Sequence, residues 1–190
     1  DQVAVVHACL PSVAIAEAVA AEAAEGSAIK CFINHGTTGS VYSKATAEML
    51  AAKGVQFLDA PISGGVAGAE AGTLAIMCSG SKEAFVAAKP GLEAMSGQLT
   101  YLGDQPGAAQ TMKLCNNILF FCNFAATLES LTLGAKAGLD PEQMLEIMNK
   151  ATGRSFSTEH IIGPNILTRQ FDFGGANYII EKDMELWRQE

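Results

Sequence analysis

Three polar side chains stand out in a long stretch, residues 108–135, whose other positions are mostly apolar. Lys113 and Asn117 are four residues apart, so they share one face of a helix, and Asn116 lies beside them. A lysine in such a helix either extends its ammonium group along the surface to solvent or faces a polar cavity. In a cavity, loss of solvent lowers the pKa of a lysine toward values that suit an acid–base catalyst. Both interpretations are compatible with the spacing.

A second feature is the run Ser63-Gly64-Gly65, which follows a short apolar segment and Asp59-Ala60-Pro61-Ile62. A hydroxyl group followed by two glycines leaves backbone N–H groups uncovered, and such groups can hold an anion such as a carboxylate. The alternative is an ordinary glycine-rich turn. The run lies at the carboxyl end of a predicted parallel strand, where open α/β sheets bind their ligands.

Up to about residue 103, short apolar runs alternate with longer stretches that are rich in Ala, Glu and Lys. This pattern predicts strands at residues 3–9, 29–33, 55–58, 74–78 and 99–102, with helices at 13–25, 41–53 and 82–95. Strands separated by helices of this length are typical of parallel βαβ units. Residues 1–104 are therefore predicted to form an α/β domain.

From Gly107 onward the pattern is helical. Residues 108–135 form one long helical pattern without proline, and further helices are expected from Asp140-Pro141, at 158–169 and at 178–189. This part, residues 105–190, is predicted to be an all-α domain that begins with a long interdomain helix.

The long helix also raises the question of a membrane span. Its uncharged part, residues 114–128, is shorter than the roughly 20 residues that a spanning helix needs, and it contains Asn116, Asn117 and Asn123. We therefore expect a helix that protein buries on several sides, and no membrane.

Composition indicates which kinds of partner and which cellular compartment to expect. The formal net charge is −8, so the protein repels polyanions and a nucleic-acid partner is not expected. The five cysteines lie in apolar segments without regular spacing, which predicts reduced thiols in the core of a cytoplasmic protein. His7, His35 and His160 lack the spacing of metal ligands, so no metal site is expected, and His35 is interpreted as a solvated turn residue.

Three motifs together resemble one enzyme family. They are Asp59-Ala-Pro-Ile-Ser-Gly-Gly65, Gly107-Ala-Ala-Gln-Thr-Met-Lys113-Leu-Cys-Asn-Asn117 and Glu181-Lys182-Asp183, in order across nearly the whole chain. With this spacing they resemble the β-hydroxyacid dehydrogenases, especially the 3-hydroxyisobutyrate dehydrogenase branch. The resemblance implies a partial Rossmann-type parallel sheet followed by an all-α domain.

The resemblance also implies roles for individual residues. Lys113 matches the catalytic lysine, and Asn117 matches the asparagine that orients the substrate. The segment that binds the substrate carboxylate falls on Ser63, Gly64 and Gly65. The implied cofactor contacts fall on Leu10, Pro11, Thr37 and Lys182.

The chain departs from the family pattern in three places. Asn34-His35-Gly36-Thr37 stands where the family usually has Asp-x-Ser-Thr, and Gly103-Asp-Gln-Pro-Gly107 stands where it often has Gly-x-Gly. The family's G-x-G-x-x-G turn for phosphate is not found in the sequence. We therefore expect a piece of a longer chain, with the residues that choose NAD or NADP upstream of Val3 and the closing helices after Glu190.

The implied activity is that of an NAD(P)-dependent 3-hydroxyacid dehydrogenase. A hydride passes between NAD or NADP and the CH–OH or carbonyl group of a small carboxylate substrate like 3-hydroxyisobutyrate, with Lys113 as general acid–base. The alternatives are a reductase of a small 2-oxo acid, of a semialdehyde (glyoxylate, succinic or tartronic semialdehyde) or of an imine, or a dinucleotide-binding relative without turnover. Residues 153–156 and 171–173 are expected to select the substrate, and Arg154 contacts either a second anionic group or a helix end. A homo-oligomer, dimer or tetramer, is expected.

Overall fold

The computed structural model describes residues 2–190, which form two compact units. The first unit runs to Cys115 and includes Asp183–Glu190, and the second is Asn116–Lys182. Helix α5 (Ala108–Lys136) begins in the first unit and helix α7 (Asn177–Gln189) begins in the second, and each ends in the other unit. The division of the chain into domains at residue 104 stays a prediction.

A six-stranded sheet forms the centre of the first unit. Strands β1, β2 and β3 are parallel neighbours, and the last residues of the three strands, Ala8, Asn34 and Asp59, lie side by side. Their carboxyl ends therefore share one edge of the sheet. The strands are β1 (Val5–Ala8), β2 (Cys31–Asn34), β3 (Gln56–Asp59), β4 (Ile62–Ser63), β5 (Leu74–Gly80) and β6 (Ser96–Tyr101).

Strand β5 departs from the parallel order that the sequence predicts. It runs antiparallel to β3 and β4 and parallel to β6. The sequence pattern predicts neither the two-residue strand β4 nor the short helix α3 (Gly65–Glu70) that follows it. The chain turns back from β4 into β5 through α3 without a crossover, which produces an antiparallel pair. The sheet remains mostly parallel, and the predicted fold class is confirmed.

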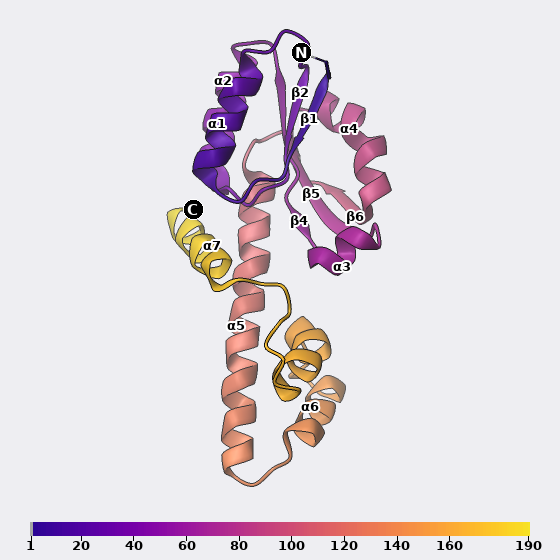
Figure 1. Ribbon diagram of the computed structural model, residues 1–190, viewed down its shortest axis with the longest axis vertical. Helices are drawn as coiled ribbons and strands as arrows, with labels where there is room; N and C mark the ends of the chain where they lie inside the picture. Colours follow the sequence, from indigo (N-terminus) through magenta and orange to yellow (C-terminus); the bar gives the residue numbers. More distant parts are fainter. Residues whose placement is uncertain (1) are drawn as a thin grey trace. The chain divides into compact units, whose positions relative to one another are not determined.

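Helices cover both faces of this sheet (Figure 1). Helices α1 (Val13–Ala24) and α2 (Gly39–Ala51) lie on one face, and α4 (Lys82–Met95) lies on the other. Alternate residues of a strand point to opposite faces, so β2 contributes Phe32 to one apolar core and Ile33 to the other. The predicted bounds of these three helices hold within two residues.

Two serines determine where the outer helices begin. The hydroxyl groups of Ser12 and Ser81 accept the amide protons of Ile15 and Ala84 at the N-termini of α1 and α4, at 3.3 and 3.2 Å. A side-chain acceptor at this position satisfies an amide that has no partner within the helix.

The second unit contains the rest of α5, then α6 (Pro141–Lys150), the π-helix η1 (Ser157–Leu167) and the start of α7. Helix α6 begins as predicted, because the Asp140 carboxylate accepts the amide proton of Gln143 at 3.1 Å and proline follows at the first helical position. The helix predicted at residues 158–169 is η1.

The apolar core of the second unit has three buried members, Leu131, Leu145 and Ile162. Helix α5 contributes one side to this core and exposes another, where Leu119 and Leu133 are 62% and 72% exposed. By length and composition α5 could cross a membrane, and 17% of its most apolar window is buried within the described chain. The prediction of a helix buried on several sides is therefore wrong for residues 2–190, because the helices that follow it pack against one side.

Candidate active site

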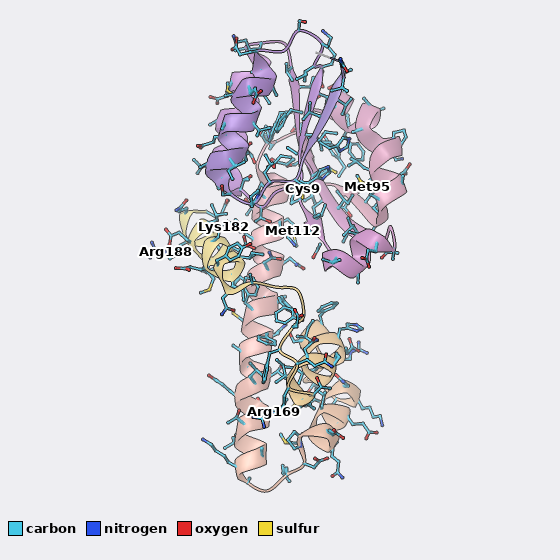
Figure 2. The ribbon with its side chains drawn as sticks, viewed as in Figure 1. Cys9, Met95, Met112, Arg169, Lys182 and Arg188 are labelled. Carbon is cyan, nitrogen blue, oxygen red and sulfur yellow. The ribbon has the colours of Figure 1, made fainter. Side chains whose placement is uncertain are left out.

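Lys113 lies near the start of α5, in the part of the helix that belongs to the first unit. It is 7% exposed, whereas the preceding residue, Met112, is 44% exposed. Figure 2 labels Met112 on α5. The lysine therefore does not extend along the surface to solvent. Of the two interpretations that the spacing allows, the structure supports the buried polar group.

A buried carboxylate holds the beginning of α5. Asp59, the last residue of β3, is 0% exposed. Its two oxygens accept hydrogen bonds from the backbone N–H of Gly107 (2.8 Å), the hydroxyl of Ser43 (2.7 Å) and the side-chain amide of Gln110 (3.0 Å). The carboxylate thus binds the helix end whose amides lack intrahelical acceptors, at the positive end of the helix dipole.

Two opposing effects act on the ionisation of Asp59. Burial raises the pKa of the carboxyl group, and the hydrogen bonds from Ser43, Gln110 and Gly107 lower it. Burial is the larger effect, so the pKa of the Asp59 carboxyl group lies above its usual value.

Gln110 is 0% exposed and uses both ends of its amide. Its Oε1 accepts the backbone amides of Thr38 (2.9 Å) and Gly39 (3.3 Å). Its Nε2 donates to the carbonyl oxygen of Gly36 and to Asp59 Oδ1, both at 3.0 Å. One side chain therefore ties α5 to the loop between β2 and α2 and to the end of β3.

Gly107 allows α5 to approach α2 closely. Its φ of 94° lies in the left-handed region that favours glycine. A Cβ at this position would lie 2.7 Å from Ser40 Cβ and 3.0 Å from Ser40 Cα. Two residues on, the amide of Ala109 donates to the buried hydroxyl of Ser79 at 2.9 Å. Backbone geometry and hydrogen bonds together fix where this helix begins.

The segment Ser63-Gly64-Gly65 joins β4 to α3. Ser63 pairs with Ala75 of β5 and is half-buried, and the two glycines are exposed. Gly64 adopts a φ of 129°. The backbone N–H groups here precede or open a helix, where they lack intrahelical acceptors. The geometry is compatible with binding a carboxylate, and that role stays a prediction.

The predicted cofactor contacts Leu10, Pro11 and Thr37 follow the neighbouring strands β1 and β2. The two segments are close, because a Cβ on Gly36 would lie 3.4 Å from the carbonyl oxygen of Leu10. The structure thus brings these residues to the sheet edge where α/β proteins bind ligands. Their roles toward a cofactor stay predictions.

His35 is 7% exposed, so its interpretation as a solvated turn residue is wrong. Its Nδ1 lies 2.9 Å from the carbonyl oxygen of Ala60, and its Nε2 lies 2.9 Å from His7 Nδ1, with the two rings stacked. A carbonyl oxygen only accepts, so Nδ1 of His35 carries the proton and the neutral ring accepts from His7 at Nε2. Burial lowers the pKa of both rings.

Asn117 and Lys182 belong to the second unit. Asn117 follows Lys113 by four residues within the continuous helix α5, and Lys182 lies on α7 and is half-buried. Their roles toward substrate and cofactor stay predictions.

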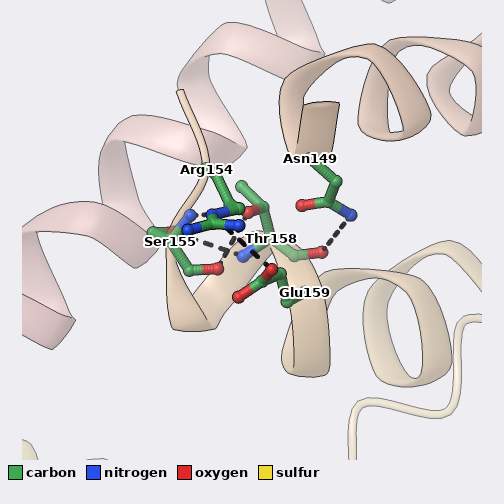
Figure 3. Close-up of polar contacts among 5 residues, drawn as sticks. All are labelled: Asn149, Arg154, Ser155, Thr158 and Glu159. Carbon is green, nitrogen blue, oxygen red and sulfur yellow. Dashed lines mark hydrogen bonds and ion pairs between the residues drawn. The ribbon is translucent and has the colours of Figure 1, made fainter. Parts of the chain in front are cut away.

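Arg154 also lies in the second unit, where its Nε is 3.7 Å from the carboxylate of Glu159 (Figure 3). Glu159 occupies the first turn of η1, and Ser155 and Thr158 exchange hydrogen bonds beside it. The arginine therefore contacts a helix end, one of the two interpretations that the sequence allows.

The five cysteines are free thiols, and two of them are buried as predicted, Cys31 and Cys78. Cys9, Cys115 and Cys122 are exposed, so the prediction of core thiols is wrong for these three. Within residues 2–190, no group of three His, Cys, Asp or Glu side chains could hold a metal ion.

Sequence reasoning assigned no role to Asp59 or Gln110, although both lie in the quoted motifs. The available signal was a polar amide three residues before Lys113 in an apolar helix. The pairing of His7 with His35 had no local signal, because 28 residues separate the two rings.

Comparisons with known proteins agree with this arrangement. Residues 1–103 match the family model described as the NAD binding domain of 6-phosphogluconate dehydrogenase. Residues 107–190 match the model described as NAD-binding of NADP-dependent 3-hydroxyisobutyrate dehydrogenase.

Two curated bacterial relatives and one solved structure are similar to the chain. The 2-(hydroxymethyl)glutarate dehydrogenase of Eubacterium barkeri is 41% identical over 140 residues, which is 74% of this chain and 46% of that protein. The 3-hydroxyisobutyrate dehydrogenase of Pseudomonas aeruginosa is 45% identical over 115 residues, 60% of this chain and 38% of that protein. The chain thus spans less than half the length of these relatives. The structure of Mycobacterium tuberculosis 3-hydroxyisobutyrate dehydrogenase with L-serine has a TM-score of 0.87 at 28% identity, covering 99% of this chain and 67% of that one.

Proposed function

Because the chain belongs to the β-hydroxyacid dehydrogenase family, in its 3-hydroxyisobutyrate dehydrogenase-like branch, we propose that it carries the acid–base site of an NAD(P)-dependent 3-hydroxyacid dehydrogenase. The observation that carries this proposal is the burial of Lys113 near a start of α5 that hydrogen bonds to Asp59 hold in place. Lysines are seldom buried in proteins, and buried ionisable groups concentrate at functional sites, which supports a chemical role for this one.

The proposal gives each predicted residue one task. The substrate is a small 3-hydroxy acid whose carboxylate binds the backbone N–H groups of Ser63, Gly64 and Gly65, and Asn117 orients it. The nicotinamide cofactor, NAD or NADP, binds along Leu10, Pro11, Thr37 and Lys182, and when bound it accepts or supplies the hydride.

Lys113 manages the proton that accompanies hydride transfer. In the oxidation direction its neutral amine takes the proton of the substrate hydroxyl as the C–H bond breaks and the C=O bond forms. In the reduction direction its ammonium group returns that proton to the carbonyl oxygen. Holding the lysine and the hydroxyl group in place lowers the entropic part of the barrier.

An absorbance assay of the reduced nicotinamide tests this proposal on the intact protein with small 3-hydroxy acids and the corresponding aldehydes. We expect Lys113→Ala to lower kcat about 10³-fold while the Kd of the cofactor stays the same. Lys136→Ala is the matched control, since Lys136 is exposed in the last turn of the same helix. Near-normal turnover of Lys113→Ala, or no turnover of the unmodified protein with any such substrate, would contradict the proposal.

The remaining expectations concern the setting of the protein. We propose a homo-oligomer, dimer or tetramer, because α5 exposes apolar residues such as Leu119 and Leu133. We also propose a cytoplasmic location, which the free cysteines support. Light scattering that finds a monomer would contradict the first of these.

A further inference from the structure

We propose that Gln110 is a positioning residue that locks the loop bearing Thr37 to the helix bearing Lys113. The inference rests on the proposed function, because it gives Thr37 and Lys113 their roles toward cofactor and substrate. It adds a residue that touches neither and sets the distance between them.

Gln110 meets the loop between β2 and α2 at three points. Its Oε1 accepts the amides of Thr38 and Gly39, and its Nε2 donates to the carbonyl oxygen of Gly36. These three residues flank Thr37 on both sides. These bonds fix the loop on both sides of Thr37, so the position of Thr37 depends on the position of α5.

The same amide binds the end of β3. Nε2 donates its second proton to Asp59 Oδ1, and Asp59 Oδ2 accepts the amide proton of Gly107 just before α5. Gln110 and Gly107 thus donate to different carboxyl oxygens of Asp59. The helix therefore cannot shift along its axis or rotate about it without losing one of these two bonds. Lys113 follows Gln110 by three residues, less than one helical turn, and moves with it.

The chemistry of the side chain is specific. An amide of this length offers an oxygen that accepts two bonds and a nitrogen that donates two, and Gln110 uses all four. A carboxylate of equal length keeps the acceptor side but loses both donors. It also brings a second carboxyl group against the buried carboxyl group of Asp59, and two like charges at this distance would repel strongly in a dry site.

The decisive variant is therefore Gln110→Glu, which changes one atom and no volume. We expect kcat to fall about 100-fold, as for a displaced catalytic group. The KM of the cofactor rises as well, because the loop around Thr37 is released. The KM of the hydroxy acid changes little, because Ser63 is held by its pairing with Ala75.

The chain offers a matched control for this change. Gln143 is the third residue of α6, as Gln110 is the third residue of α5, and its side chain is exposed. We expect Gln143→Glu to leave kcat and both KM values unchanged. An equal loss of kcat in both variants would overturn the inference.

Exchanging the amide and the carboxyl group between positions 59 and 110 distinguishes a loss of positioning from general damage to the fold. In the double variant Asp59→Asn/Gln110→Glu, the amide and the carboxyl group change places and the site again holds one carboxyl group. The bond to Gly36 is not restored, so we expect partial recovery, about 10-fold in kcat over Gln110→Glu alone. A double variant no better than Gln110→Glu would argue against the network as the source of the effect.

Hydrogen exchange gives a readout that does not depend on turnover. In the protein without cofactor, the amides of Thr38, Gly39 and Gly107 should exchange faster in Gln110→Glu, while the amides of α6 keep their rates. If the unmodified protein oxidises no hydroxy acid, the proposed function fails. This measurement still tests whether Gln110 holds the loop around Thr37 to α5. Unchanged exchange together with unchanged kcat in Gln110→Glu would overturn the inference while leaving the proposed function intact.

Discussion

The two ends of α5 lie in different kinds of surroundings. In the first unit its start is surrounded by buried polar groups, and Asp59, Gln110 and Ser79 are all 0% exposed and hydrogen-bonded. In the second unit the helix contributes Leu131 to a small apolar core. In the described part of the chain, the buried side-chain atoms without a hydrogen-bond partner are Asn149 Oδ1 and Ser157 Oγ in the second unit and Tyr42 Oη, on α2, in the first.

This difference shows how stability is divided between the units. A satisfied polar network is directional, so it fixes the position of a helix. A small apolar core is not directional, and a few buried side chains supply nearly all of its stabilisation. We therefore expect substitutions near the start of α5 to affect geometry and activity, and substitutions in the second unit to affect local stability.

The largest expected effect on stability is that of Ile162→Ala in the second unit. Ile162 is 0% exposed and is one of the three buried members of the core. Removing its side chain leaves a cavity and should cost about 2–5 kcal/mol. Urea unfolding would measure the loss. Amide hydrogen exchange should become faster in α6 and η1 and stay unchanged in the strands of the first unit.

Ile147→Ala is the control for this change, because Ile147 lies on α6 and is 66% exposed. It should cost within about 0.5 kcal/mol of zero. If Ile162→Ala accelerated exchange equally in β2 and β3, the two units would share one cooperative core and the comparison would fail.

A smaller effect is expected for Gly107→Ala at the polar end of α5. Gly138 provides the control, because its φ of 90° is close to the 94° of Gly107 and a Cβ there would meet open space. Gly138→Ala should cost about 1–2 kcal/mol for the backbone conformation alone. Gly107→Ala should cost about 1 kcal/mol more, because its Cβ meets Ser40.

The activity of the same two variants sharpens the comparison. Displacement of α5 at Gly107 moves Lys113, so kcat should fall in Gly107→Ala and remain normal in Gly138→Ala. Thermal unfolding and steady-state kinetics measure both. Equal costs for the two glycines would mean that the close approach to Ser40 relaxes without strain.

The difference between local signals and contacts between distant segments explains which features could be predicted from the sequence. Periodicity and capping residues predicted α4 and α5 within a residue and the start of α6, because these signals are local. A lysine in an apolar helix was also visible in the sequence, and the structure shows that Lys113 is buried. Its catalytic role follows from the family resemblance and stays a prediction.

Contacts between distant segments could not be predicted in this way. Gln110 meets Thr38 across 72 residues and His7 meets His35 across 28, and no spacing rule connects such positions. The direction of β5 was missed because two residues of β4 carry too little pattern to register as a strand. The exposed side of α5 was missed because an apolar sequence indicates that a helix is buried but does not show what covers it.

The smallest predicted effect is a dependence of stability on pH that comes from the first unit. Burial lowers the pKa of His7 and of His35 below the usual value of 6.5. Between the lowered values and about 6.5 the unfolded chain therefore binds more protons than the folded chain does. The free energy of unfolding should be fully present above pH 6.5 and decrease as the pH falls below it, which urea midpoints between about pH 7.5 and 5 would show.

His35→Gln separates the histidine pair from the carboxylates that also titrate in acid. Gln keeps an N–H donor for the carbonyl oxygen of Ala60, which His35 Nδ1 contacts at 2.9 Å, but it does not titrate. The decrease in stability between pH 6.5 and 5 should therefore be smaller in this variant than in the unmodified protein. If both proteins lost stability equally over this range, the stacked pair would not be a source of the pH dependence. Asp59 could not supply it either, because its raised pKa favours the folded state as the pH falls.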